Sequence, residues 1–278
     1  MTLGALVRAV ARRLRKAALR YGHGTANARD EAAFLVLRGL RLPFEAPADR
    51  PVTPREASRV EQLVRRRIRD RIPAAYLLNE AWLADQPFYV DRRVIIPRSH
   101  IAFLLAELGK PRRVLDLCTG SACLAILAAR AFPQARVDGS DLSSRALAVA
   151  RRNVAAHRLR GRVKLMQSDL FAALARRRYD LILCNPPYVA GPAMRSLPRE
   201  YLHEPSVALA AGEDGLDLVH RIIDQAYEHL RPNGLLVCEI GANRKALLRK
   251  YPRTPFRWPA DQVFLLRRED LPRGKNVG

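Results

Sequence analysis

From Arg112 onward, short apolar runs alternate with longer amphipathic segments, and this alternation constrains the fold more than any other feature of the chain. We expect strands at residues 112–118, 135–142, 162–170, 179–184 and 234–240, and helices at 122–132, 143–159, 214–230 and 243–251. Strands that alternate with helices form a mostly parallel sheet, covered by helices on both faces. Ligands bind such sheets beyond the carboxyl ends of the strands, so the residues that directly follow each strand are the candidates for function.

The first part of the chain has a different pattern, in which apolar residues recur every three or four positions. This spacing predicts helices at residues 3–20, 28–40 and 54–71. Apolar stretches interrupted by Pro87 predict a β-hairpin at residues 81–97, before a short helix at 101–108. We therefore predict a smaller helical domain at residues 1–80, a β-hairpin and linker helix at 81–110, and a doubly wound α/β domain at 111–278.

The composition is that of a globular protein with a large excess of positive charge. The 278 residues are 49% hydrophobic and 27% charged, and the net charge is +22. No apolar run reaches the roughly 18 residues needed to span a bilayer, and arginines interrupt the N-terminal segment where a signal peptide has an apolar core. These features favour a soluble protein that lies in the cytoplasm and has no membrane partner.

The positive charge has two explanations, which the sequence leaves open. A strongly basic chain is typical of proteins that work near nucleic acid. Only six of the 49 basic residues are lysine, however, so a general bias toward arginine gives the same charge. The four cysteines fit neither a redox pair nor a zinc site, and the six histidines form no HExxH motif, so we expect no metal.

Polar residues stand at the ends of four predicted strands. Thr119 and Gly120 form a small-residue turn after the first strand, and Asp141 follows the second. The third strand ends at Ser168 and Asp169, and the fourth ends at Asn185. A single carboxylate before a helix is often only an N-cap, but four polar strand ends in succession favour a binding site.

The turn after the first strand lacks the GxGxxG spacing and the Walker lysine of phosphate-binding loops. Asp116 stands directly before this turn, and its carboxylate would repel a phosphate. It suits a ligand with a cationic amino-acid tail. A nucleoside without phosphates that carries a positive charge indicates S-adenosylmethionine.

At this point the sequence resembles the class I S-adenosylmethionine-dependent methyltransferases, and specifically the protein-glutamine N5 methyltransferases. The branch it resembles most closely methylates a glutamine of the third protein of the large ribosomal subunit. The segments that carry the likeness are YGHGTANARDEA (21–32), RIPAAYL (71–77), FYVDRRVIIPRS (88–99), LDLCTGSACLAI (115–126), CNPPYV (184–189) and EYLHEPSVALAAGEDGLDL (200–218). The resemblance implies a Rossmann-like fold, S-adenosyl-L-methionine as cofactor, and a ribosomal protein, free or in a pre-ribosomal particle, as partner.

The resemblance also implies roles for residues in the segment Asn185-Pro186-Pro187-Tyr188. These four would bind the substrate, and the catalytic group would be Asn185, Pro186 and Tyr188. Amide resonance draws the nitrogen lone pair into the carbonyl, so a glutamine amide is a poor nucleophile. The side-chain oxygen of Asn185 and the backbone oxygen of Pro186 would accept both amide hydrogens, while Tyr188 would lie against the amide plane.

For the cofactor, the resemblance implies that Asp141 holds the ribose and that Asp169 borders the adenine. Asp116, Thr119 and Gly120 would form the floor beneath the methionine tail, and Asn185 would also contact the cofactor.

We also expect roles for three further residues near these motifs. Arg98 either lines the cofactor pocket or is a surface arginine, and His203 and Glu204 would brace the loop after the motif.

One residue departs from the family pattern. Ala122 stands where the family has a glycine, and its methyl group would either crowd the cofactor tail or begin the helix more firmly.

Two other functions remain open at this stage. Adenine-N6 methyltransferases acting on RNA or DNA use a similar tetrad, because the exocyclic amino group poses the same lone-pair problem, and the basic charge favours them. No nucleic-acid target module is evident, and the segment at 203–216 is typical of the glutamine family. A non-catalytic ribosome-assembly protein is the third reading. Contact with ribosomal RNA through the basic surface is a further expected partnership.

Overall fold

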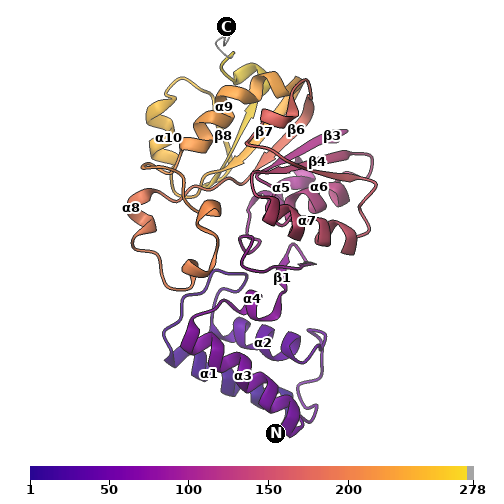
Figure 1. Cartoon of the computed structure of the whole chain (residues 1–278), viewed down its shortest axis with the longest axis vertical. Coiled ribbons are helices and arrows are strands. Elements are labelled where there is room, and N and C mark those ends of the chain that lie inside the picture. The colour runs from indigo at the N-terminus through magenta and orange to yellow at the C-terminus, as the bar shows by residue number, and fades with distance from the viewer. Residues whose placement is uncertain (274–278) are drawn as a thin grey trace.

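The computed structural model describes residues 1–273 of the chain. It has a helical part at one end and a seven-stranded sheet at the other, with a small hairpin between them (Figure 1). The helical part contains α1 (Leu3–Lys16), α2 (Ala28–Gly39), α3 (Pro54–Asp70) and α4 (Ala74–Leu78). The hairpin consists of β1 (Ala81–Leu83) and β2 (Gln86–Phe88), and α5 (Ile101–Leu104) leads to the sheet.

The predicted N-terminal helices are present with shorter ends. Helix α3 begins at a capping box in which Thr53 accepts from the backbone of Glu56 and Glu56 accepts from the backbone of Thr53, with Pro54 at the first helical position. Helix α1 ends at Lys16 instead of continuing to Arg20, because Ala18 turns into the left-handed region with φ +46°. The hairpin is also shorter than expected and ends at Phe88 instead of Pro97.

Sheet strands and helices alternate along the rest of the chain as predicted. The elements are β3 (Arg113–Leu117), α6 (Cys123–Ala131), β4 (Arg136–Asp141), α7 (Ser144–Ala156), β5 (Val163–Gln167), β6 (Tyr179–Cys184), α8 (Gly191–Met194), α9 (Asp217–His229), β7 (Leu230–Glu239), α10 (Arg244–Lys250), β8 (Arg257–Ala260) and β9 (Val263–Arg267). Short 3₁₀ turns lie at Leu105–Glu107, Ala172–Leu174, Tyr201–His203, Ser206–Ala208 and Arg268–Asp270.

The strand order is β5-β4-β3-β6-β7-β9-β8. The first five strands in this order are parallel, and β9 and β8 add an antiparallel edge. The chain therefore starts in the middle of the sheet at β3 and winds outward in both directions. This arrangement confirms the predicted doubly wound, mostly parallel sheet of the class I methyltransferase type.

Side chains along each strand alternate between two apolar cores, as the period of two requires. Val114 and Leu183 pack on the side covered by α5, α6 and α7, whereas Leu115 and Ile182 pack on the side covered by α9 and α10. The helical part has its own core, to which α1, α2 and α3 contribute. Within residues 1–273, no helix is both long and apolar enough to span a membrane.

Candidate active site

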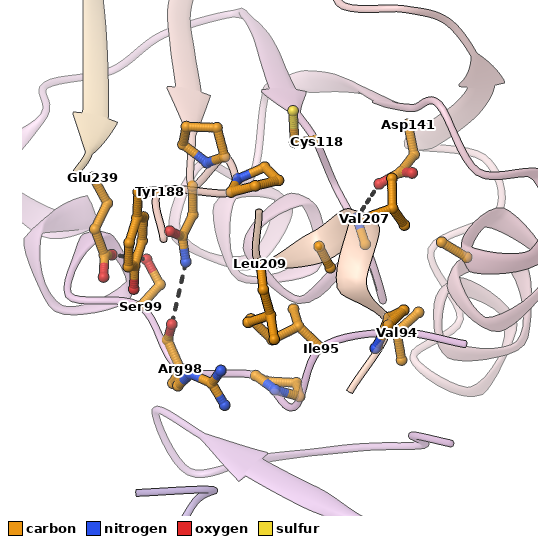
Figure 2. A pocket seen from close by; sticks show the side chains of 18 of the residues that line it. Val94, Ile95, Arg98, Ser99, Cys118, Asp141, Tyr188, Val207, Leu209 and Glu239 are labelled. Atoms are coloured by element: carbon orange, nitrogen blue, oxygen red, sulfur yellow. Dashed lines mark hydrogen bonds between the residues drawn. The ribbon is translucent and has the colours of Figure 1, made fainter. Parts of the chain in front are cut away.

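A cavity of about 600 Å³ lies where β3, β4 and β6 end, and residues from the hairpin linker and from the loop after β6 close its other sides. It brings together most of the residues that the sequence predicted. The predicted residues that line it are Gly120, Asp141, Asp169, Asn185, Pro186, Pro187 and Tyr188. Figure 2 shows an apolar wall formed by Val94, Ile95, Val207 and Leu209 facing polar groups at the strand ends. The strand ends therefore form one site.

Asn185 follows β6 directly, and its side chain is oriented by the backbone of another segment. Its amide nitrogen donates to the main-chain oxygen of Arg98 at 3.2 Å (Figure 2). Because that oxygen can only accept, the amide group of Asn185 must face Arg98, and the side-chain oxygen must point the other way. Among residues 1–273, no group donates to this oxygen, so it is free to accept from a ligand.

Arg98 is itself fixed by a buried carboxylate. Its guanidinium makes two hydrogen bonds with Glu204, at 2.7 and 2.6 Å, and Glu204 also accepts from the backbone of Ile96 at 3.0 Å. The Glu204 side chain is fully buried, whereas the Arg98 side chain is partly exposed and lines the cavity. Of the two expectations for Arg98, its place in the cavity wall is the one the structure supports. Glu204 holds it there, and His203 binds the backbone oxygen of Asp70 through Nε2 at 2.9 Å.

Tyr188 lies where the tetrad turns away from the sheet, and two glycines make room for it. A Cβ on Gly241 would lie 2.8 Å from the Tyr188 ring, and one on Gly215 would lie 2.5 Å from the Tyr188 main-chain oxygen. The side chain of Asn243 donates to that same oxygen at 2.8 Å. Burial raises the pKa of Tyr188 to about 12, and the charge of Glu239 adds to the shift, so the phenol stays neutral near pH 7.

Asp141 ends β4 and connects two loops of the cavity. One carboxylate oxygen accepts from the backbone of Gly120 at 2.8 Å, and the other accepts from the backbone of Ser143 at 2.8 Å. Burial raises the pKa of this carboxyl. Each oxygen keeps a further lone pair, so the carboxylate can accept from a pair of adjacent hydroxyl groups in the cavity.

Asp169 lines the cavity at the end of β5 but is more open to solvent. It is exposed, and it pairs with Arg221 at 2.9 Å. The neighbouring Ser168 is buried, and its hydroxyl donates to the backbone of Leu170 at 2.7 Å. Asp169 therefore offers an acceptor at the rim, whereas Ser168 holds the turn.

Asp116 and Thr119 do not line this cavity, contrary to the expectation that they form its floor. Asp116 lies within β3 and shares the face of Val114, which points toward α6. Its carboxylate accepts from the hydroxyl of Thr119 and from the backbone of Ala125 at 2.9 Å. Burial raises the pKa of Asp116 to about 7. These two side chains hold the loop that presents Gly120 to the cavity.

Ala122 is also outside the cavity lining, and its backbone explains why a glycine suits the position. It precedes α6 with φ +65°, in the left-handed region that L-residues with a Cβ disfavour. It is fully buried, and its side chain makes no capping hydrogen bond. The departure from the family pattern therefore strains the backbone and adds no group to the cavity.

Sequence reasoning missed Glu239, a buried carboxylate of the cavity. It ends β7, next to β6 in the sheet, and accepts from the hydroxyl of Ser99 at 2.7 Å (Figure 2). It also accepts from the backbone of His100 at 3.0 Å. The sequence contains a signal for it, because Glu239 ends an apolar strand, as Asp141 also ends a strand. Among residues 1–273, no group of three histidine, cysteine or acidic side chains is arranged to hold a metal ion.

Comparisons with known proteins identify relatives of this chain. A family model described as the methyltransferase small domain matches residues 100–212. The chain is 50% identical to the ribosomal protein uL3 glutamine methyltransferase of Bordetella pertussis, over 97% of this chain and 96% of that protein. It is 47% identical to the protein of the same name in Bradyrhizobium diazoefficiens, over 98% and 92%, and 44% identical to that of Neisseria meningitidis serogroup B, over 97% and 94%. These matches span the helical part as well as the sheet.

Proposed function

Because the chain belongs to the family of ribosomal protein uL3 glutamine methyltransferases, we propose that it transfers a methyl group from S-adenosylmethionine to the side-chain amide nitrogen (N5) of a glutamine in uL3, a protein of the large ribosomal subunit. The observation that carries the proposal is the orientation of Asn185. Its side-chain oxygen accepts from no group of residues 1–273, while its nitrogen donates to the main-chain oxygen of Arg98. A carboxamide substrate needs such an acceptor.

The tetrad suits a carboxamide because it can present two acceptors to one NH₂ group. Asn185 contributes its side-chain oxygen, and Pro186 contributes its backbone oxygen. Hydrogen bonds to both amide hydrogens return electron density to the nitrogen and fix its direction. The prolines restrict the backbone, so the two acceptors keep their relative position.

Tyr188 stays neutral and provides an aromatic face for the amide plane. Such a face excludes water and tolerates the positive charge that develops on the nitrogen. The methylated nitrogen would be strongly acidic, so one of its two hydrogens would leave as a proton along its hydrogen bond to Asn185 or Pro186 and pass to water, while the sulfur would leave as a neutral thioether. No strong base is needed for this proton loss. The lowering of the barrier comes mainly from alignment, for which roughly 7–11 kcal/mol is available when the reacting atoms are close to the attack geometry.

The cavity also fits the cofactor that this family implies. Asp141 would hold the ribose hydroxyls, Asp169 would border the adenine, and the backbone around Gly120 and the side chain of Asn185 would contact the methionine part. When bound, S-adenosylmethionine supplies a methyl group on a positively charged sulfur. Asp116 and Thr119 would act through the loop they hold.

The substrate and setting complete the proposal. The helical domain, residues 1–80, would read the ribosomal protein, residues 81–110 would link the two domains, and residues 111–278 would carry the chemistry. The partner would be uL3, either free or in a pre-ribosomal particle in the cytoplasm, with contact to ribosomal RNA through the basic surface.

The test uses purified enzyme, isotope-labelled cofactor and three acceptors: recombinant uL3, RNA and DNA. We expect label in uL3, at a glutamine located by peptide mass spectrometry. Asn185→Ala should lower kcat by about 10²–10³-fold, as the loss of one transition-state hydrogen bond does elsewhere, while calorimetry finds nearly unchanged cofactor binding. Label in nucleic acid would instead indicate an adenine-N6 methyltransferase, and absence of cofactor binding would indicate a non-catalytic assembly protein.

A further inference from the structure

A second cavity, of about 1100 Å³, lies at the opposite end of the parallel strands from the active site, where β3, β4 and β5 begin. We call it the basic groove, because seven of its 14 lining residues are basic and one is acidic. The basic residues are Arg113, Arg136, Arg151, Arg160, Arg162, Lys164 and Arg177. Arginine and lysine make up 49 of the 278 residues overall, so this groove concentrates positive charge well beyond the average of the chain.

Few of these charges are neutralised within the groove. Its one carboxylate, on Asp138, is already engaged by Arg177 at 3.0 Å and by the hydroxyl of Tyr179 at 2.8 Å. Arg162 donates to the backbone oxygens of Phe132 and Ala135, which fixes its position in the wall. The guanidinium of Arg113 lies over the Tyr179 ring, 6.0 Å from its centroid. Four of the seven charges therefore remain to be accounted for.

The side chains of Arg136, Arg151, Arg160 and Lys164 make no ion pair or hydrogen bond with any other group in residues 1–273, and all four are exposed. Two exposed arginines of α3 differ from these four, because Arg65 pairs with a glutamate and Arg69 with an aspartate, each at 2.7 Å. Like charges gathered in a concave surface repel one another, and a bound polyanion relieves that repulsion.

The lining identifies the kind of polyanion. The groove exposes no aromatic ring on which a base could stack, because Tyr179 is only 1% exposed. Guanidinium groups match phosphate oxygens in geometry and charge. We propose that the basic groove binds the phosphate backbone of structured RNA, independently of base sequence.

The position of the basic groove keeps RNA away from the active site. Arg136 begins β4 in the groove, and Asp141 ends the same strand in the catalytic cavity. Five residue steps of about 3.3 Å separate these two positions by roughly 16 Å. The enzyme can therefore hold RNA at the amino ends of the strands while the cavity at their carboxyl ends receives a protein side chain. The inference does not depend on which group is methylated.

The test compares two variants of the full-length protein that lose the same charge. Arg136→Gln/Arg160→Gln/Lys164→Gln removes three cations from the basic groove. Arg8→Gln/Arg12→Gln/Arg15→Gln removes three exposed cations from the convex surface of α1, where they lie on one helical face. Binding of a short RNA duplex is measured for both variants and the wild type over a range of salt concentrations. Thermal melting checks that the three proteins are equally folded.

We expect the groove variant to bind the duplex about ten-fold more weakly or worse, and its slope of log affinity against log salt to fall by about three, one for each lost phosphate contact. The α1 variant should stay within about two-fold of the wild type. Equal losses in both variants would show that net charge alone is responsible and would overturn the proposal. The proposal would also be overturned if the groove variant kept its affinity for the duplex. Binding of poly-glutamate is measured alongside, and if the groove variant lost that binding alone, the partner would be an acidic protein. Methyl transfer to purified uL3 serves as a separate readout, and the groove variant should retain it.

Discussion

The side-chain nitrogen of Asn185 donates to the main-chain oxygen of Arg98 at 3.2 Å, although the two residues are 87 positions apart in the chain. Arg98 is in turn bound by the buried carboxylate of Glu204. The orientation of the Asn185 amide therefore depends on three segments: the end of β6, the linker after the hairpin, and the loop that follows the tetrad. This relationship makes Glu204 a positioning residue for Asn185.

We expect Glu204→Ala to lower both stability and turnover. Removing one partner of a buried ion pair leaves the other without compensation, which costs about 3 kcal/mol in the free energy of unfolding. Turnover should fall while the KM for the cofactor changes little, because Asn185 loses its fixed direction. Asp91→Ala is the matched control, since its pair with Arg93 at 2.6 Å is more exposed and contributes about 1 kcal/mol or less. Denaturant unfolding and steady-state kinetics measure both effects, and a Glu204→Ala enzyme with wild-type kcat would remove the positioning role.

Gly241→Ala tests the placement of Tyr188. The new Cβ would lie 2.8 Å from two ring carbons of Tyr188, closer than atoms of neighbouring groups approach, so the ring must move. We expect kcat to drop by about ten-fold or more, since small displacements at a reacting centre are costly. The control is Gly109→Ala, because Gly109 also has a left-handed φ (+78°, against +55° at Gly241) but a Cβ there meets nothing within 4 Å. Equal activity in both variants would mean that the Tyr188 ring is not needed where it lies.

Ala122→Gly should change the free energy of unfolding by no more than about 1 kcal/mol. Glycine relieves the left-handed strain at φ +65°, which is worth about 1–2 kcal/mol, but it adds about 0.5–1 kcal/mol of chain entropy and removes a buried methyl group worth about 0.8 kcal/mol. Cofactor affinity should stay the same, since Ala122 does not line the cavity. Differential scanning calorimetry and cofactor titration check the two parts. A large rise in cofactor affinity would restore the idea that the methyl group crowds the tail.

The sequence predicted the sheet and the place of the tetrad at a strand end, because both follow from short-range patterns. Buried parallel strands are continuous apolar runs, and Asn185 directly follows one of them. The antiparallel edge formed by β8 and β9 was missed, since Pro259 and the polar residues around it obscure the alternation.

Asp116 was misplaced for a different reason. Asp116 is the fourth residue of β3, in which alternate side chains face opposite cores. The residues of the turn after β3 do not follow this alternation. The period of two along β3 puts its carboxylate on the side of α6, which is where the structure has it. Arg98 and Glu204 required the tertiary structure, because no local pattern pairs residues 106 positions apart.

The buried carboxyl of Asp116 makes stability depend on pH in a direction opposite to that of most acidic residues. Burial raises its pKa to about 7 in the folded protein, whereas an unfolded aspartate titrates near 3.9. Between these values the unfolded chain releases its proton first, so the contribution of Asp116 to stability falls as the pH rises from about 4 to about 7. An asparagine at this position cannot ionise, so Asp116→Asn should remove this part of the dependence of stability on pH. The free energy of unfolding of the variant, relative to that of the wild type, should therefore be higher at pH 8 than at pH 5. Urea unfolding at several pH values measures the difference, and parallel pH profiles for the two proteins would show that Asp116 stays ionised when buried.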